Sequence, residues 1–263
     1  MKPCPDTFPF PLVALDETAS TNQYLSQLCN QLQESVAELT TVTAEFQTAG
    51  KGQRGNTWEA EEGKNLLFSF VLYPSFLEAR RQFILSQIVS LAIKEELSRW
   101  SDEITIKWPN DIYCHGLKLG STFTQVASPP DRHGDVAVIF SVGVNLSVPA
   151  DRLPTPESTS LRMHVAPLPP TAELIDMIAA RLVASLRTRL EAFVQMPLIQ
   201  SSRLRSEMHH VCWMMGRQID AQLIDDRTIA GKVVSLNDDA SISVRTASGE
   251  TERLSTGDIG LMV

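Results

Sequence analysis

The sequence predicts an α+β protein in which a mixed sheet with helices is followed by a small β-barrel. Strand-like and helix-like apolar patterns interleave up to about residue 212. From residue 213 onward, short β-type runs alternate with turn residues. With 43% apolar and 21% charged residues, the 263-residue chain can bury an ordinary core without disulfides. We therefore expect two domains, residues 1–212 and 213–263.

The first part of the chain predicts two helices and two strands. Ser20 or Thr21 is a favourable N-cap for a helix that places Tyr24, Leu25, Leu28 and Leu32 on one face. Apolar alternation predicts strands over residues 39–46 and 65–73, and a glycine-rich loop separates them. A long helix is expected over residues 78–100.

The second part predicts further strands, two helices and the barrel. Strands are expected within residues 104–108, 113–125 and 135–146, divided by turn sequences at PND, HG and SPPDRHG. After a proline-rich stretch, Thr171 is expected to cap a helix that runs to about residue 194, and another helix follows over residues 197–210. The barrel runs are residues 218–224, 229–236 and 242–247.

Charge and composition exclude several classes of protein. The net charge of −8 argues against a surface built to neutralise nucleic-acid phosphates. No apolar run approaches the roughly 18–20 residues of a membrane helix, and the proline-rich start is unlike a signal peptide. The four cysteines form no CxxC pair, and the five histidines have no metal-ligand spacing. A cytoplasmic protein with reduced thiols is expected.

Residues 47–58, QTAGKGQRGNTW, form a glycine-rich loop that contains Lys51 and Arg54. Glycines let backbone N–H groups approach a ligand, and the two cations can neutralise a phosphate or a carboxylate. An anion site and a flexible solvated loop both agree with this pattern. Trp58 either covers a flat ring or belongs to the core.

The sequence KWPND, residues 107–111, follows a predicted strand. Its last three residues suit a tight turn, and Asp111 either makes a surface ion pair or binds a divalent cation that accompanies phosphates. Lys118 either is solvated or stabilises carboxylate and phosphoryl oxygens. Asn145 either reads a base edge or caps a turn. No GxSxG motif is present, which weakens a covalent hydrolase interpretation.

Taken in order, these motifs resemble the biotin protein ligases. The matching segments are Asp16 to Asn22, QTAGKGQRGNTW, GKNLLFSF, KWPNDIY, Lys118-Leu-Gly120, the strand end at Gly143-Val-Asn145, and STSL at residues 158–161. The resemblance spans most of residues 12–161, and the tail resembles the SH3-like β-barrel of these enzymes.

The resemblance implies a catalytic domain like that of class II aminoacyl-tRNA synthetases. Its substrates would be biotin and ATP, with Mg²⁺, and the intermediate would be biotinyl-5'-AMP. The acceptor would be a lysine of the biotin carboxyl carrier protein of a biotin-dependent carboxylase. DNA binding is not expected, because the match begins within the first twenty residues. Family members occur as monomers and as dimers, so a homodimer stays open.

The resemblance also assigns roles by position. The catalytic cations would be Lys118, Lys51 and Arg54. The biotin-binding residues would be Ser20, Thr21, Gln47, Gly50, Lys51, Lys118 and Gly120. The residues that bind ATP or the adenylate would be Arg54, Trp58, Asn110, Asp111 and Asn145, with Asp111 also the Mg²⁺ ligand.

Two departures from the family pattern keep alternatives open. Gln53 stands where many relatives have arginine, and the polar run from Ser121 to Gln125 replaces small aliphatic residues. Ser121 in particular could obstruct the approach of biotin to the backbone. A lipoate or octanoyl ligase of the same fold and a non-catalytic biotin-binding homologue are the alternatives.

Overall fold

The computed structural model describes residues 10–31, 36–52, 55–77, 83–127, 136–255 and the backbone of residues 259–262. Its largest element is a seven-stranded sheet in the order β1-β2-β5-β9-β8-β7-β6. The pairing of β1 with β2 is parallel, and every other neighbouring pair in this sheet is antiparallel. The strands are β1 (Leu12–Thr18), β2 (Thr41–Gln47), β5 (Asn65–Leu72), β6 (Ile104–Lys107), β7 (Asp111–Cys114), β8 (Leu117–Ala127) and β9 (Ala137–Asn145).

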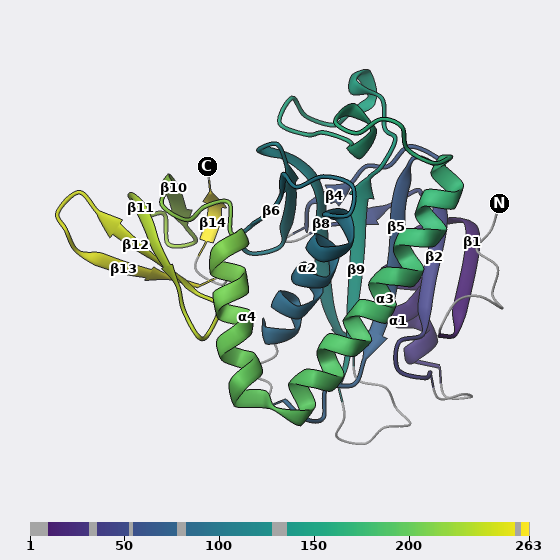
Figure 1. Cartoon of the computed structure of the whole chain (residues 1–263), viewed down its shortest axis with the longest axis horizontal. Coiled ribbons are helices and arrows are strands. Elements are labelled where there is room, and N and C mark those ends of the chain that lie inside the picture. Colours follow the sequence, from purple (N-terminus) through teal and green to yellow (C-terminus); the bar gives the residue numbers. More distant parts are fainter. Residues whose placement is uncertain are drawn as a thin grey trace.

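Helices cover both faces of this sheet, as Figure 1 shows. Helix α1 (Thr21–Cys29) packs on one face in a small apolar cluster with side chains of β2, β5 and β9. Helices α2 (Phe83–Leu97), α3 (Thr171–Gln195) and α4 (Pro197–Val211) share the main core on the other face. Because β5 is buried on both sides, its sequence is a nearly continuous apolar run and does not alternate between apolar and polar residues.

The C-terminal part forms a five-stranded antiparallel sheet in the order β13-β12-β11-β10-β14. It lies beside α4 and β6 in Figure 1. Its strands are β10 (Gln218–Leu223), β11 (Thr228–Leu236), β12 (Ile242–Thr246), β13 (Thr251–Leu254) and β14 (Ile259–Met262). Apolar residues of this sheet belong to the same continuous core as α2 and α3. The Trp108 indole N–H also donates to the Ala240 carbonyl at 2.6 Å, which ties the KWPND turn to the turn between β11 and β12.

The α+β class is confirmed, but several local expectations differ from the structure. No strand was predicted at residues 12–18, because the prolines nearby favoured irregular structure; the segment is β1, which pairs in parallel with β2. Thr171 is the first helical residue rather than the cap, and its hydroxyl donates to Ser147. The helix expected at residues 78–100 is α2, and residues 78–82 lie outside the described part of the chain.

One feature near the site was not expected, and one expected turn is confirmed. A short hairpin, β3 (Gly50–Lys51) with β4 (Thr57–Trp58), forms within the glycine-rich loop. The HG sequence makes the turn between β7 and β8, where His115 has φ 51° and Gly116 has φ 77°. Within the described part of the chain, no helix is both long and apolar enough to cross a membrane.

We expect Trp108→Phe to lower the free energy of unfolding by about 1 kcal/mol through loss of the hydrogen bond to Ala240. The matched control is Trp100→Phe, since the buried Trp100 indole N–H has no partner among the described residues. Urea denaturation of both variants measures the difference. Equal destabilisation by the two substitutions would contradict a stabilising role for this bond.

A stacked histidine pair predicts a pH-dependent stability. The His115 and His164 rings lie 4.5 Å apart, and His164 Nε2 contacts the Thr159 hydroxyl at 2.7 Å. Burial, and secondarily His115, lower the pKa of His164 below its usual 6.5. As pH falls below about 6.5 the unfolded chain therefore binds more protons than the folded chain, and stability is lost.

The measurement is urea denaturation between pH 7.5 and 5.5 for the unsubstituted protein, for His164→Asn and for His209→Asn. The stability advantage over His164→Asn should shrink as pH falls, because only the unsubstituted protein carries the proton-linked cost. His209 is an exposed residue of α4 and is the control. A pH-independent difference between the unsubstituted protein and His164→Asn would refute this linkage.

Candidate functional site

A cavity of about 540 Å³ brings together most of the residues that the sequence singled out. It lies where the start of α1, the β3–β4 hairpin and strands β7, β8 and β9 meet. The predicted residues that line it are Ser20, Thr21, Gln47, Lys51, Trp58, Asn110, Asp111 and Lys118. Gly50, Gly120 and Asn145 do not line it, and Arg54 and Gln53 lie outside the described residues.

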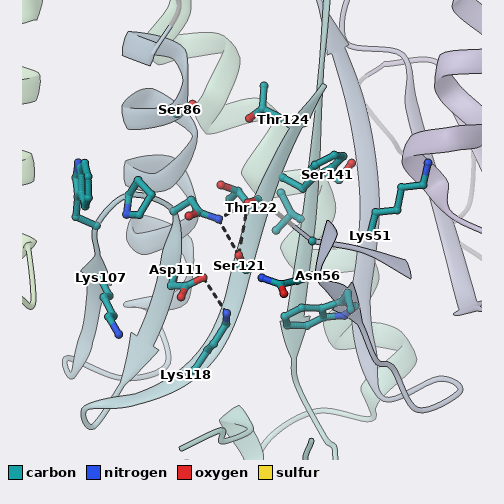
Figure 2. Close-up of a pocket in the computed structure, with 18 of the residues that line it drawn as sticks. Lys51, Asn56, Ser86, Lys107, Asp111, Lys118, Ser121, Thr122, Thr124 and Ser141 are labelled. Atoms are coloured by element: carbon teal, nitrogen blue, oxygen red, sulfur yellow. Dashed lines mark hydrogen bonds and ion pairs between the residues drawn. The ribbon is translucent and has the colours of Figure 1, made fainter. Parts of the chain in front are cut away.

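One end of the cavity is cationic. Lys118 Nζ lies 3.0 Å from the Asp111 carboxylate, and their side chains are 37% and 23% exposed. Figure 2 shows this pair spanning β7 and β8, with Lys107 on the adjacent strand. Among the described lining residues, Asp111 is the sole acid, and Lys107 and Lys118 lie at this end, whereas Figure 2 shows Lys51 on the other side of the cavity. This end is therefore suited to carboxylates and phosphates.

The backbone of Lys118 is held by the segment that contains STSL. The Lys118 N–H donates to the Glu157 carbonyl at 2.8 Å, and the Lys118 carbonyl accepts from the Thr159 N–H at 2.8 Å. Two motifs that are far apart in sequence thus form one short parallel bridge. The segment leaves the lysine's ammonium group to the cavity and to Asp111.

Asn145 has a structural role in this arrangement. Its amide nitrogen donates to the Thr159 carbonyl at 3.0 Å, and its amide oxygen accepts from Asn65 at 2.8 Å. The side chain is buried, with 4% exposure. Asn145 therefore supports the segment that holds Lys118 instead of presenting its amide to the cavity.

The KWPND turn presents the amide oxygen of Asn110 as a free acceptor beside the Asp111 carboxylate. It contains a cis peptide bond between Trp108 and Pro109. The amide nitrogen of Asn110 donates to the Ser121 hydroxyl at 3.0 Å and to the Thr122 carbonyl at 2.5 Å, as Figure 2 marks. The Asn110 amide oxygen has no hydrogen-bond partner among the described residues. Ser121, which the sequence suggested as an obstruction, lines the cavity and also accepts this hydrogen bond from Asn110.

Three glycines near the cavity allow close packing that a larger residue would prevent. A Cβ on Gly143 would lie 2.6 Å from the Trp58 ring, and one on Gly50 would lie 2.4 Å from the Trp58 carbonyl. A Cβ on Gly120 would lie 2.5 Å from the Gly143 carbonyl. Trp58 thus packs against the bare backbone of β9 at the cavity wall, which agrees with both interpretations offered for it. Gly50 allows the approach of Trp58, and Gly120 allows the close approach of β8 to β9; neither glycine lines the cavity.

The other end of the cavity is neutral and polar. The Thr21 N–H donates to the Gln47 amide oxygen at 2.8 Å, and the Thr21 hydroxyl donates to the same oxygen at 3.0 Å. Ser69 lies behind them, and its hydroxyl is 2.8 Å from that of Ser141, which itself lines the cavity. The sequence interpretation missed both serines as site residues. The available signal was a lone serine inside the apolar runs LLFSF and VIFSV, where burial requires a partner.

Comparisons with known proteins agree with this geometry. Residues 15–145 match the sequence model of the Biotin/lipoate A/B protein ligase family, a range that contains every predicted lining residue. The chain is 30% identical over 181 residues to the Bifunctional ligase/repressor BirA of Salmonella typhimurium, covering 67% of this chain and 52% of that protein. It is 24% identical over 220 residues to the Biotin--[acetyl-CoA-carboxylase] ligase of Mycobacterium tuberculosis, covering 82% and 76%.

Solved structures share the fold. The biotin protein ligase from Aquifex aeolicus in complex with biotin and ATP has a TM-score of 0.76 at 21% identity, covering 96% of this chain and 98% of that chain. The biotin protein ligase from Leishmania major in complex with biotin has a TM-score of 0.60 at 22% identity, covering 94% and 99%. The chain spans about half the length of the first curated relatives that it matches. By its matched motifs and its fold, the chain belongs to the biotin/lipoate A/B protein ligase family.

Proposed function

We propose that this chain is an ATP-dependent biotin protein ligase. It would form biotinyl-5'-AMP from biotin and ATP and then transfer biotin to a lysine of a biotin carboxyl carrier domain. Residues 1–212 would form the catalytic domain and residues 213–263 the small C-terminal domain. The observation that carries the proposal is a single cavity with a neutral hydrogen-bonding end and a lysine-rich end.

The neutral end supports biotin as the acyl substrate. A ureido ring has two N–H donors and one carbonyl acceptor, and it needs amide and hydroxyl partners in a buried site. Thr21, Gln47 and Ser141 line the cavity and supply such groups. The dithiolane ring of lipoate has neither N–H nor carbonyl groups, so it would leave these buried polar groups without partners.

The lysine-rich end supports adenylation. A carboxylate oxygen of biotin would attack the α-phosphorus of ATP, and pyrophosphate would leave. The reaction brings two anions together, so fixed cations are needed to offset their repulsion and to stabilise the charge that develops on the phosphate. Lys118 would hold the carboxylate and a phosphate oxygen, and Lys51, on the β3–β4 hairpin at the other side of the cavity, would neutralise a second oxygen.

Asp111 would have two functions in this reaction. Its ion pair orients the Lys118 ammonium group before the ligands bind. Together with the free Asn110 oxygen, its carboxylate also offers the hard oxygen donors that suit Mg²⁺, which commonly binds one or two carboxylates plus substrate phosphates. When bound, Mg²⁺ supplies charge neutralisation to the triphosphate.

The second half-reaction needs the adenylate to stay protected until the carrier arrives. The lysine amine of the carrier would attack the acyl carbon, lose a proton and displace AMP. Trp58, packed on β9 at the cavity wall, supports the assigned adenylate site by offering a flat aromatic surface. The names of the Mycobacterium tuberculosis and Aquifex aeolicus relatives support the same assignment of substrates.

The first test is exchange of labelled pyrophosphate into ATP, measured with biotin or with lipoate and without a carrier. We expect exchange with biotin only. Lys118→Met should lower the exchange rate by about 100-fold or more, because it removes a charge that stabilises the transition state. Lys232→Met is the control, since Lys232 is an exposed residue of the C-terminal sheet.

Other outcomes would redirect the assignment. Exchange that depends on lipoate would identify a lipoate ligase of the same fold. Tight biotin binding without any exchange would identify a non-catalytic homologue. Near-normal exchange in Lys118→Met would overturn the role given to this lysine.

A further inference from the structure

Five side chains under the neutral end of the cavity form one continuous chain of hydrogen bonds. Asn22 Nδ2 lies 2.9 Å from Ser141 Oγ, which lies 2.8 Å from Ser69 Oγ. Ser69 Oγ lies 2.8 Å from Thr21 Oγ1, which lies 3.0 Å from Gln47 Oε1. The residues come from α1 and from the neighbouring strands β2, β5 and β9, so the chain runs across three strands beside the cavity.

The direction of every bond in this chain follows from one fixed donor. The backbone N–H of Thr21 can only donate, and it lies 2.8 Å from the amide oxygen of Gln47. That contact determines which way the Gln47 amide faces. The Thr21 hydroxyl, which contacts the same oxygen, must then also donate to it. The amide oxygen of Gln47 therefore accepts two hydrogen bonds from Thr21, and the NH₂ group of Gln47 is left for the cavity.

The donor and acceptor roles of the remaining hydroxyls follow from this bond, because each hydroxyl has a single proton to donate. With its proton used, the Thr21 hydroxyl accepts from Ser69, and the Ser69 hydroxyl in turn accepts from Ser141. The Ser141 hydroxyl then accepts from the Asn22 amide nitrogen. Thr21 and Ser141 both line the cavity, and neither has a proton left for a ligand. Each of these two hydroxyls can therefore only accept a hydrogen bond from a ligand.

We propose that Ser69 and Ser141 are specificity-determining residues that set the hydrogen-bond polarity of the biotin pocket. This inference rests on the proposed function. Through the directed chain, the pocket offers an NH₂ donor from Gln47 and acceptor oxygens from Thr21 and Ser141. That pattern is complementary to a cyclic urea, whose carbonyl accepts and whose two N–H groups donate. If an oxygen replaces one N–H of the ring, the lone pair of that oxygen faces the lone pair of an acceptor oxygen in the pocket, and the two repel each other.

Burial makes this polarity hard to reverse. Ser69 is fully buried, and Asn22 and Thr21 are 1% and 2% exposed. Water cannot readily replace a lost partner at such positions, and turning one hydroxyl would break the bonds on both sides of it. Ser69 does not line the cavity, so it acts as a positioning residue through Thr21 and Ser141.

The test compares two ligands in the absence of ATP by isothermal calorimetry. They are desthiobiotin, which has the cyclic urea, and its cyclic carbamate analogue, in which one ring N–H is an oxygen. We expect the unsubstituted protein to prefer the urea by roughly 100-fold, because the pocket is built to bind an N–H group. In Ser69→Ala, Ser141 regains a free proton that can turn to the ring oxygen, and the preference should fall to about 10-fold or less.

Two further variants separate this role from a structural one. Ser141→Ala removes the acceptor itself and should also reduce the preference, which keeps the test available should Ser69→Ala fail to fold. Ser90→Ala is the matched control, because Ser90 is a fully buried serine whose hydroxyl has no partner among the described residues. It should leave the preference for the urea unchanged.

The outcomes distinguish failure of the specificity role from failure of the proposed function. Equal loss of affinity for both ligands in Ser69→Ala and Ser141→Ala, with the preference intact, would overturn the specificity role and leave the proposed function standing. Failure of the unsubstituted protein to bind either desthiobiotin or biotin would overturn both. A reduced preference in both serine variants but not in Ser90→Ala would support the directed chain.

Discussion

The site depends on the antiparallel pairing of β9 with both of its neighbours. On one side the register places Asn65 of β5 opposite Asn145, and Ser69 opposite Ser141. On the other side it places Ser121 of β8 opposite Gly143. Because side chains alternate between faces, a slip of one residue would move Ser141 to the other face of the sheet and break its bond to Ser69. The bare backbone at Gly143 would likewise no longer meet Trp58.

Two different electrostatic environments result from this register. The neutral end is buried and internally bonded, so its groups are fixed before a ligand arrives and reorganise little on binding. The lysine-rich end is more open, and the Lys118–Asp111 pair retains substantial exposure. A pair in that environment contributes little to stability, and its lysine can exchange one anionic partner for another at low cost. In the proposed ligase, one end would provide selectivity and the other would provide charge.

The C-terminal sheet is structurally continuous with this site. The turn between β11 and β12 accepts the Trp108 hydrogen bond, and Ala240 in that turn lines the cavity together with Trp108. The Trp213 N–H donates to the Ile106 carbonyl, which adds a backbone link to β6. A change in the C-terminal sheet can therefore be transmitted to the KWPND turn through direct contacts. The shared apolar core indicates that the two parts stabilise one another.

The sequence by itself determined the α+β class, most element positions and the motifs that meet in the cavity. Lys51, Asp111 and Lys118 could be named because their residue types and local spacing suit the chemistry, whereas Thr21 and Gln47 were named by the resemblance to biotin protein ligases. Local patterns also report helices and strands, since periodicity depends on near neighbours. They do not report which strands pair, so β1 and the β3–β4 hairpin were missed.

Only the tertiary structure decided the roles of several further residues in and beside these motifs. It showed that Asn145 braces the Lys118 segment, that Ser121 orients Asn110, and that Ser69 and Ser141 join one chain. Ser69 and Ser141 are 72 residues apart in sequence. Their contact depends on the register of two strands, and register is set by long-range burial and pairing across the sheet rather than by local sequence.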